Sequence, residues 1–131
     1  KASYFPTQDL SGNPNVQIDP NIDFDWQRTK ADLSSVRWEG YLKSDFDEQY
    51  TFTTTSDDGI RIWINDIQII NSWDLHSAKE DVGKINLDKG RFNKITVEHF
   101  EQYDYAIAKL AWASKSQPSQ IVPASYFYHS K

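Results

Sequence analysis

Hydrophobic and polar residues alternate with a period of two along most of the chain, which is the pattern of half-buried strands. The clearest runs cover residues 36–42, 50–55, 60–64, 92–100 and 106–112. In one of them, Ile60, Ile62 and Ile64 share a face, while Arg61 and Trp63 share the other. No stretch shows the period of an amphipathic helix, although residues 27–35 could form one helical turn. The pattern predicts about nine short strands separated by turns.

Strands of this length and spacing are typical of an antiparallel β-sandwich or barrel. We therefore expect an all-β fold, an antiparallel sandwich of two packed sheets with little helix, in which each sheet buries one side. The 131 residues suit a single domain with one core that spans 1–131. The chain shows no signal peptide and begins at Lys1, so we expect a module excised from a larger multidomain protein.

Turn residues separate the predicted strands. Asn65 and Asp66 fit a two-residue hairpin turn because both tolerate positive φ, and residues 56–59 form a second turn. The other segments are assigned by composition. The opening is a short strand followed by turn-rich chain, 71–83 is a loop, a short strand contains Ile85 and Leu87, 115–120 is a loop, and 125–128 is a closing strand.

The stretch 50–73 resembles the PA-fourteen family, which is named after anthrax protective antigen. The matching elements are Tyr50-Thr51-Phe52, Ser56-Asp57-Asp58-Gly59, Ile60-Arg61-Ile62-Trp63-Ile64, Ile69-Ile70 and Trp73. Further blocks match in order along nearly the whole chain, at 24–26, 36–41, 108–112 and 121–123. The resemblance implies a sandwich of two antiparallel sheets.

The family also carries a functional expectation. Its lectin-like members include fungal adhesins, bacterial surface adhesins and modules attached to glycosidases. In these members two consecutive Asp residues, joined by a cis peptide, bind a calcium ion that holds vicinal hydroxyls of a sugar. Other members, in toxin translocation subunits, have no known sugar role.

Asp57 and Asp58 match the consecutive Asp residues of the lectin-like members. Neighbouring side chains diverge on an extended trans chain, whereas a cis bond would bring both carboxylates to one side. Calcium takes about six to eight oxygens, so a second loop must contribute. The resemblance implies that this loop is 101–105, with Gln102 and Asp104 as further metal ligands and the backbone carbonyl of Tyr105 as another.

A sugar also requires an aromatic face and hydrogen-bonding partners. The candidates comprise the calcium ligands and the aromatic or polar residues of the flanking loops. The sugar-binding set is thus Asp57, Asp58, Gln102, Tyr103, Asp104, Tyr105, Trp73 and His76. Trp26, Trp38, Trp63 and Trp112 alternate with polar residues in strands, so we expect them to pack in the core.

Two alternatives stand beside this interpretation. The acidic turn could be only a turn that Asp and Gly favour, in which case the chain would be a non-catalytic structural or protein-interaction module of a secreted multidomain protein or toxin. Catalysis is not expected, because glycosidase carboxylates flank the scissile bond about 5–10 Å apart and adjacent Asp residues on one metal cannot. His76 and His99 lack partners at zinc spacing and are treated as surface or packing residues.

The composition limits the kinds of binding partner that we expect for this chain. The net charge of −5 argues against nucleic acid, and no apolar run approaches the roughly twenty residues of a membrane span. The absence of Cys and Met is compatible with a stable extracellular module. We therefore expect a monomeric module, secreted or on the cell surface, that binds glycans with calcium as cofactor and does not insert into a membrane.

Overall fold

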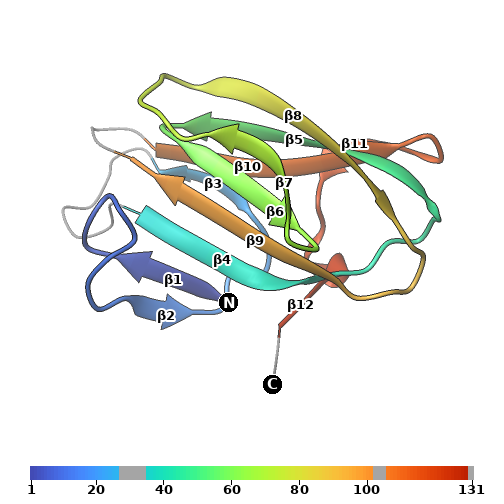
Figure 1. The fold of residues 1–131 in the computed structure, drawn as a ribbon, viewed down its shortest axis with the longest axis horizontal. Coiled ribbons are helices and arrows are strands. Elements are labelled where there is room, and N and C mark those ends of the chain that lie inside the picture. Colours follow the sequence, from blue (N-terminus) through green and yellow to red (C-terminus); the bar gives the residue numbers. More distant parts are fainter. Residues whose placement is uncertain (27–34, 102–105, 130–131) are drawn as a thin grey trace.

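The computed structural model describes residues 1–26, 35–101 and 106–129, and this part of the chain contains twelve strands and one short 3-10 helix. The strands are β1 (Ala2–Phe5), β2 (Asn15–Gln17), β3 (Asp23–Trp26), β4 (Ser35–Leu42), β5 (Glu48–Asp57), β6 (Ile60–Ile64), β7 (Ile67–Ser72), β8 (Lys79–Leu87), β9 (Asn93–Phe100), β10 (Ala106–Ser114), β11 (Gln117–Ile121) and β12 (Phe127–Tyr128), and the helix η1 is Ala124–Tyr126. The all-β prediction is confirmed (Figure 1).

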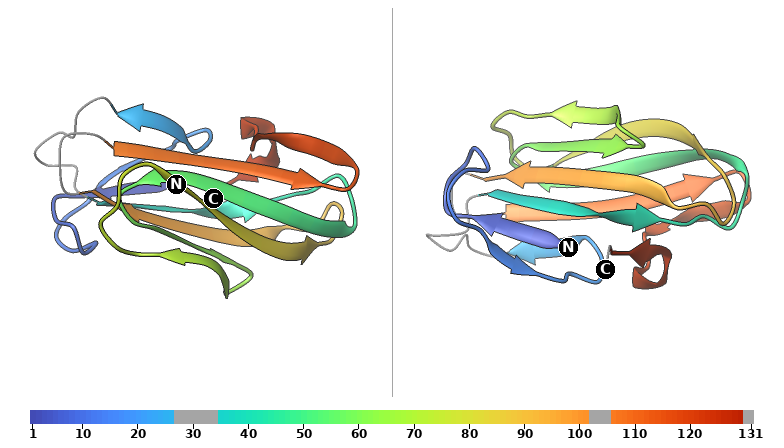
Figure 2. Two further views of the ribbon diagram at one scale, coloured as in Figure 1. Left: turned by 90° about the horizontal axis from the view of Figure 1, so that it is seen from above. Right: turned by 60° about the horizontal axis from the view of Figure 1, so that its bottom comes forward.

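The strands form two sheets that pack face to face (Figures 1 and 2). The seven-stranded sheet has the order β2-β1-β4-β9-β6-β7, with β12 beside β4, and the five-stranded sheet has the order β11-β10-β5-β8, with β3 beside β10. Neighbouring strands pair antiparallel throughout both sheets. None of the helical structure in the described residues is long and apolar enough to cross a membrane.

The core lies between the sheets and is rich in aromatic side chains. Trp112 is 1% exposed, and its ring centroid lies 4.9 Å from that of Tyr50 and 6.2 Å from that of Phe52. The inner face of β6 contributes its three isoleucines, all fully buried. Burial along β5 and β10 alternates residue by residue, which is the period-two pattern predicted from the sequence.

The four tryptophans predicted to pack in the core have different positions. Trp38 and Trp112 are buried. Trp63 is only half-buried, because it shares the outer face of the seven-stranded sheet with Arg61, whose guanidinium carbon lies 5.5 Å from the Trp63 ring centroid. The side chain of Trp26 lies outside what the structure describes.

Several predicted loops are wrong. The segment 71–83 contains the end of β7 and the first half of β8, and the predicted loop 115–120 and the turn-rich opening contain most of β11 and all of β2. Strands β2 and β11 are edge strands of their sheets and bury no residue, so they carry no alternating pattern. At the chain's end only Phe127–Tyr128 is a strand, preceded by η1. The possible helical turn at 27–35 falls largely on residues outside the described part.

Gly83 sits where the edge of one sheet meets the edge of the other. A Cβ at this position would lie 2.4 Å from the carbonyl oxygen of Ile69 in β7, which is closer than real Cβ contacts. We expect Gly83→Ala to lower the free energy of unfolding by about 1–3 kcal/mol, because β7 and β8 must separate to admit the methyl group. Chemical denaturation measures this loss. Val82→Ala is the control, since Val82 is exposed on the same strand and should change stability by about 0.5 kcal/mol or less.

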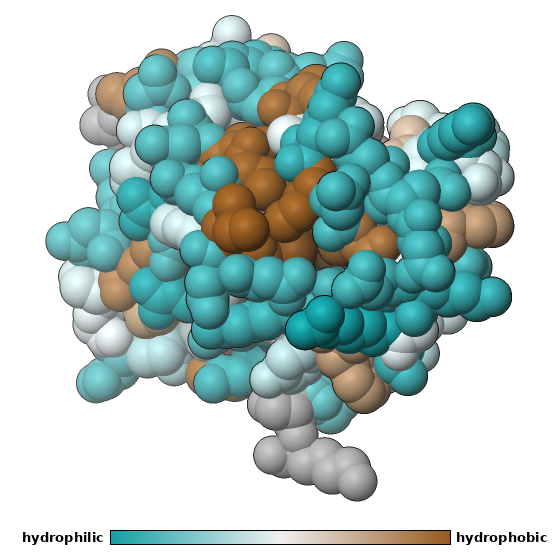
Figure 3. Space-filling view, turned by 45° about the vertical axis from the view of Figure 1, so that its right-hand side comes forward, coloured by the Kyte–Doolittle hydropathy of each residue, from teal (hydrophilic) through white to brown (hydrophobic). Residues whose placement is uncertain are grey.

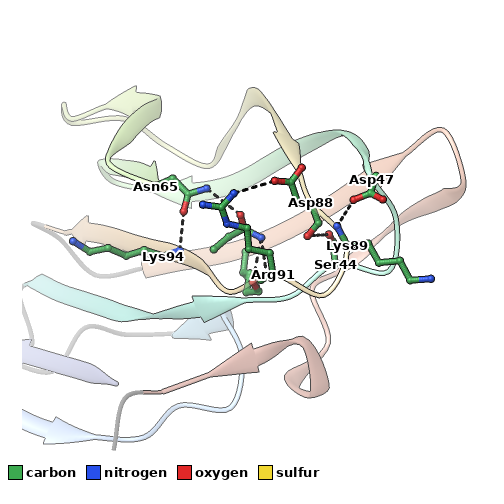
Figure 4. A network of polar contacts seen from close by, with 9 residues as sticks. Ser44, Asp47, Asn65, Asp88, Lys89, Arg91 and Lys94 are labelled. Carbon is green, nitrogen blue, oxygen red and sulfur yellow. Dashed lines mark hydrogen bonds and ion pairs between the residues drawn. The ribbon is translucent and has the colours of Figure 1, made fainter.

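The turns at one end of the sandwich are held by a polar network (Figure 4). Asn65 and Asp66 have φ values of 51° and 66°, as their predicted hairpin turn requires. The Asn65 side chain accepts a hydrogen bond from the Lys94 backbone N–H at 3.1 Å, and Asp88 pairs with Arg91 at 3.2 Å. At this end of the sandwich, polar side chains therefore stabilise the turns.

Apolar side chains reach the surface on one side of the molecule. Figure 3 shows them gathered in a hollow that is surrounded by hydrophilic residues. On the edge strands β7 and β8, Ile67 and Val82 are each 58% exposed, while Ile69 and Ile85 pack partly against the core. The core is thus less completely covered along the edges of the sheets than at their centres.

Candidate functional site

Strands β5, β7 and β9 end, and β6, β8 and β10 begin, at one end of the sandwich, the left-hand end in Figure 1, so three connections between the two sheets start and finish there. The first joins β5 to β6 through Asp58 and Gly59 alone. It is this short because β5 includes Asp57, the first residue of the acidic pair. The second joins β7 to β8 through residues 73–78, and the third joins β9 to β10 through residues 101–105. Every residue of the predicted site belongs to one of these connections or borders it.

Strand register brings the ends of these connections together. Asp57 pairs with Ile107 of β10, and Ile60 pairs with His99 of β9, so the strands that flank residues 101–105 lie on both sides of the acidic pair. Ile60 also pairs with Ser72 at the end of β7. Residues far apart in the sequence therefore converge on Asp57 and Asp58.

The peptide bond between Asp57 and Asp58 is cis, as the resemblance implies. Asp58 is 7% exposed, and its Oδ1 accepts a hydrogen bond from the His76 backbone N–H at 3.0 Å. Asp57 is half-buried. Burial raises the pKa of the Asp57 carboxyl above its usual value, and the neighbouring charge of Asp58 raises it further. A cation at this position would relieve the repulsion between the two carboxylates.

The second connection supports the acidic pair. His76 holds Asp58 through its backbone, while its ring nitrogens lie 2.8 Å from the Ser77 carbonyl oxygen and 3.5 Å from the Ser72 hydroxyl. The ring of Trp73 packs against Phe100, with centroids 4.7 Å apart, and the Arg61 guanidinium carbon lies 3.8 Å from its centroid. His76 thus contacts Asp58, whereas Trp73 packs against Phe100 and Arg61.

The other four predicted site residues lie outside the described part of the chain. These are Gln102, Tyr103, Asp104 and Tyr105, and their placement stays a prediction. The residues before and after them, Glu101 and Ala106, are both buried.

The donors that the structure describes fit part of a calcium site. Two adjacent carboxylates are the hard oxygen ligands that calcium prefers, but they are only two of about six to eight required. In the described ranges, no group of three His, Cys, Asp or Glu residues comes together to hold a metal ion. The remaining oxygens would therefore come from the predicted ligands of the third connection, from backbone carbonyls or from water.

Residues of β9 also contact the acidic turn, and the sequence did not assign them to the site. His99 Nε2 donates a hydrogen bond to the Asp57 carbonyl oxygen at 3.0 Å. The Phe100 N–H donates to the Gly59 carbonyl oxygen at 3.0 Å, and a Cβ at position 59 would lie 2.1 Å from the Phe100 ring. The sequence contains one signal that could have identified His99: it is a polar residue at the next position of the apolar face that carries Ile95 and Val97.

Comparison with known proteins agrees with this architecture. The family model described as the PA14 domain matches residues 1–126. The anti-sigma-I factor RsgI3 of Acetivibrio thermocellus is 39% identical over 136 residues, an alignment that covers 99% of this chain and 21% of that protein. A solved anti-sigma factor domain-containing protein superposes with a TM-score of 0.93 at 37% identity, covering 99% of this chain and 47% of the other.

A third relative shares the fold at lower identity. The PA14 sugar-binding domain from an RTX adhesin has a TM-score of 0.73 and 14% identity, covering 98% of this chain and 97% of the adhesin domain. The chain spans only about a fifth of RsgI3 and just under half of the solved anti-sigma factor chain. Because the family model matches almost the whole sequence, the chain belongs to the PA14 domain family.

Proposed function

We propose that this chain is a calcium-dependent carbohydrate-binding module. The observation that carries the proposal is the strand pairing that brings the ends of β7 and β9 and the start of β10 around Asp57 and Asp58. Acidic side chains crowded at a loop end, with one held by a backbone N–H, suit a cation better than they suit packing. The PA14 sugar-binding domain of the RTX adhesin, which has the same fold, supports a sugar as the ligand.

In this proposal Asp57 and Asp58 hold the ion from the first connection, and Gln102 and Asp104 hold it from the third. A bound calcium ion supplies open coordination positions for two vicinal hydroxyls of a sugar. The protein's own part is to orient Asp58 through the His76 N–H and to place Tyr103 and Tyr105 near the ligand. No catalytic role is proposed.

The relatives suggest what kind of larger protein contains this module. The similarity to RsgI3 over 99% of the chain supports a parent that is an anti-sigma factor, in which this module provides an input that responds to sugar. We further propose that the module lies outside the cell, where polysaccharides are encountered. Its ligand is then a glycan, and no nucleic acid is involved.

Asp58→Asn tests the proposal. It should weaken calcium binding on the order of 100-fold, because affinity follows the number of charged ligands, and glycan binding should disappear with it. Isothermal titration with calcium, followed by a glycan array with calcium or with chelator, measures both effects. Calcium at about 100 times its dissociation constant should stabilise the wild type by about 2.7 kcal/mol.

Asp66→Asn is the matched control. It removes one negative charge from the exposed hairpin turn of β6 and β7, away from the acidic pair, and should leave calcium and glycan binding unchanged. Glycan binding that survives both the chelator and Asp58→Asn contradicts the proposal. A wild type with no glycan hit and no calcium-dependent stabilisation would favour a protein-interaction module instead.

A further inference from the structure

His99 is a polar residue in an otherwise apolar position. It lies on the inner face of β9, two residues after Val97, and is 2% exposed. Its neighbours in register are Ile60 on one side and Val36 on the other. A leucine would fill this place at similar volume and would avoid burying two ring nitrogens, which is costly. The core alone therefore does not explain a histidine here.

The hydrogen bond that His99 makes to Asp57 indicates a role for this histidine. Asp57 is the last residue of β5, and the chain leaves the five-stranded sheet at this point. Its carbonyl oxygen accepts the Nε2–H of His99 at 3.0 Å, across the interior from the seven-stranded sheet. Burial lowers the pKa of His99 to about 4, so the imidazole is neutral at physiological pH and remains a single-proton donor.

Two further hydrogen bonds hold other atoms of the acidic turn, at Gly59 and at the Asp58 carboxylate. Phe100 donates its N–H to the Gly59 carbonyl oxygen, and its ring closes the space above Gly59. The His76 N–H donates to the Asp58 carboxylate from the second connection. Of these three contacts, only the one to Asp57 is made by a side-chain donor, so it can be removed by substitution without altering the backbone.

We propose that His99 is a positioning residue for the Asp57–Asp58 pair. It anchors the Asp57 carbonyl to β9, and thereby fixes where both carboxylates stand relative to the second connection. The consequence for calcium rests on the proposed function, whereas the anchoring itself concerns the protein without any ion. His99 contacts neither ion nor sugar in this role.

His99→Leu and His99→Gln test the anchoring in metal-free protein with chelator present. Leucine removes the donor at similar volume, while glutamine retains an N–H at similar reach. Hydrogen exchange of the His76 amide, followed by NMR, reports whether Asp58 is still in place. We expect its protection to fall about tenfold in His99→Leu, which corresponds to losing one satisfied buried acceptor, and to be retained in His99→Gln.

Control measurements keep the result interpretable. The amide of Val97, in the middle of β9, should be equally protected in all three proteins and so reports an intact fold. If His99→Leu does not fold, His99→Met removes the same donor and carries the same expectation. A folded leucine or methionine variant whose His76 amide is as protected as in the wild type overturns the proposal.

Calcium titration of the same proteins adds the functional readout. The calcium dissociation constant should rise about tenfold in His99→Leu and return close to the wild-type value in His99→Gln. A wild type that binds neither calcium nor glycan refutes the proposed function, while the exchange comparison still decides the role of His99. The two proposals therefore fail through different results.

Discussion

Replacing Trp112 by alanine is expected to lower the free energy of unfolding by about 3–5 kcal/mol, the range for truncating a fully buried large aromatic residue. Trp112 is 1% exposed, and its ring meets those of Tyr50, Phe52 and Tyr126 at centroid distances of 4.9, 6.2 and 5.1 Å. Alanine leaves a cavity that these rigid rings fill poorly. Urea denaturation followed by circular dichroism measures the loss.

Trp63→Ala is the matched control for this substitution. It removes the same side chain from the outer face of the seven-stranded sheet, where Trp63 is half-buried. The loss there should be about 1–2 kcal/mol, since less area returns to water and no enclosed cavity forms. Equal losses for the two variants would contradict the assignment of Trp112 to the centre of the core.

Acidification is expected to destabilise the protein through His99. Its pKa is about 4 in the folded protein, against 6.5 for the unperturbed histidine of an unfolded chain. Between these values the unfolded state binds a proton that the native state does not. The contribution of His99 to the free energy of unfolding is therefore fully present above pH 6.5 and is lost as pH falls towards 4. The loss by pH 4 amounts to about 3 kcal/mol, with about 2 kcal/mol of it reached by pH 5.

Denaturation curves at pH 7, 5 and 4, with chelator present, measure this dependence. Asp57, Asp58 and His76 are the charged or titratable neighbours, and the raised pKa of Asp57 acts in the opposite direction. His99→Leu isolates the histidine, because the variant should lose the pH-dependent part attributed to it. Parallel pH profiles for the variant and the wild type would show that His99 is not the group responsible.

The sequence predicted those strands that bury one face and expose the other. β4, β5, β6, β9 and β10 all lie at or next to the centre of a sheet, so packing against the other sheet imposes the period of two on their residues. The sequence predicts a loop at 79–83, the first half of β8, because this edge segment carries mostly exposed residues and shows no alternation. Its strand conformation comes from pairing with β5, which no local pattern reports.

The acidic pair could be found from the sequence because its two residues are adjacent. The resemblance to a family supplied the expectation that their peptide bond is cis, and the bond is cis. The contribution of His99 could not be found in the same way, because Asp57 and His99 are 42 positions apart in the sequence. From the sequence, His99 is predicted only to be a surface or packing residue.

The sequence alone thus determined the all-β class, the family and the two carboxylates, since each depends on periodicity or on neighbouring residues. Only the tertiary structure decided what surrounds those carboxylates. The ends of β7 and β9 and the start of β10 meet at Asp57 and Asp58 because β5, β8 and β10 lie in one sheet while β6, β7 and β9 lie in the other. That arrangement follows from how whole strands pair and pack, so the support given by His76 and His99 appears only once the two sheets are assembled.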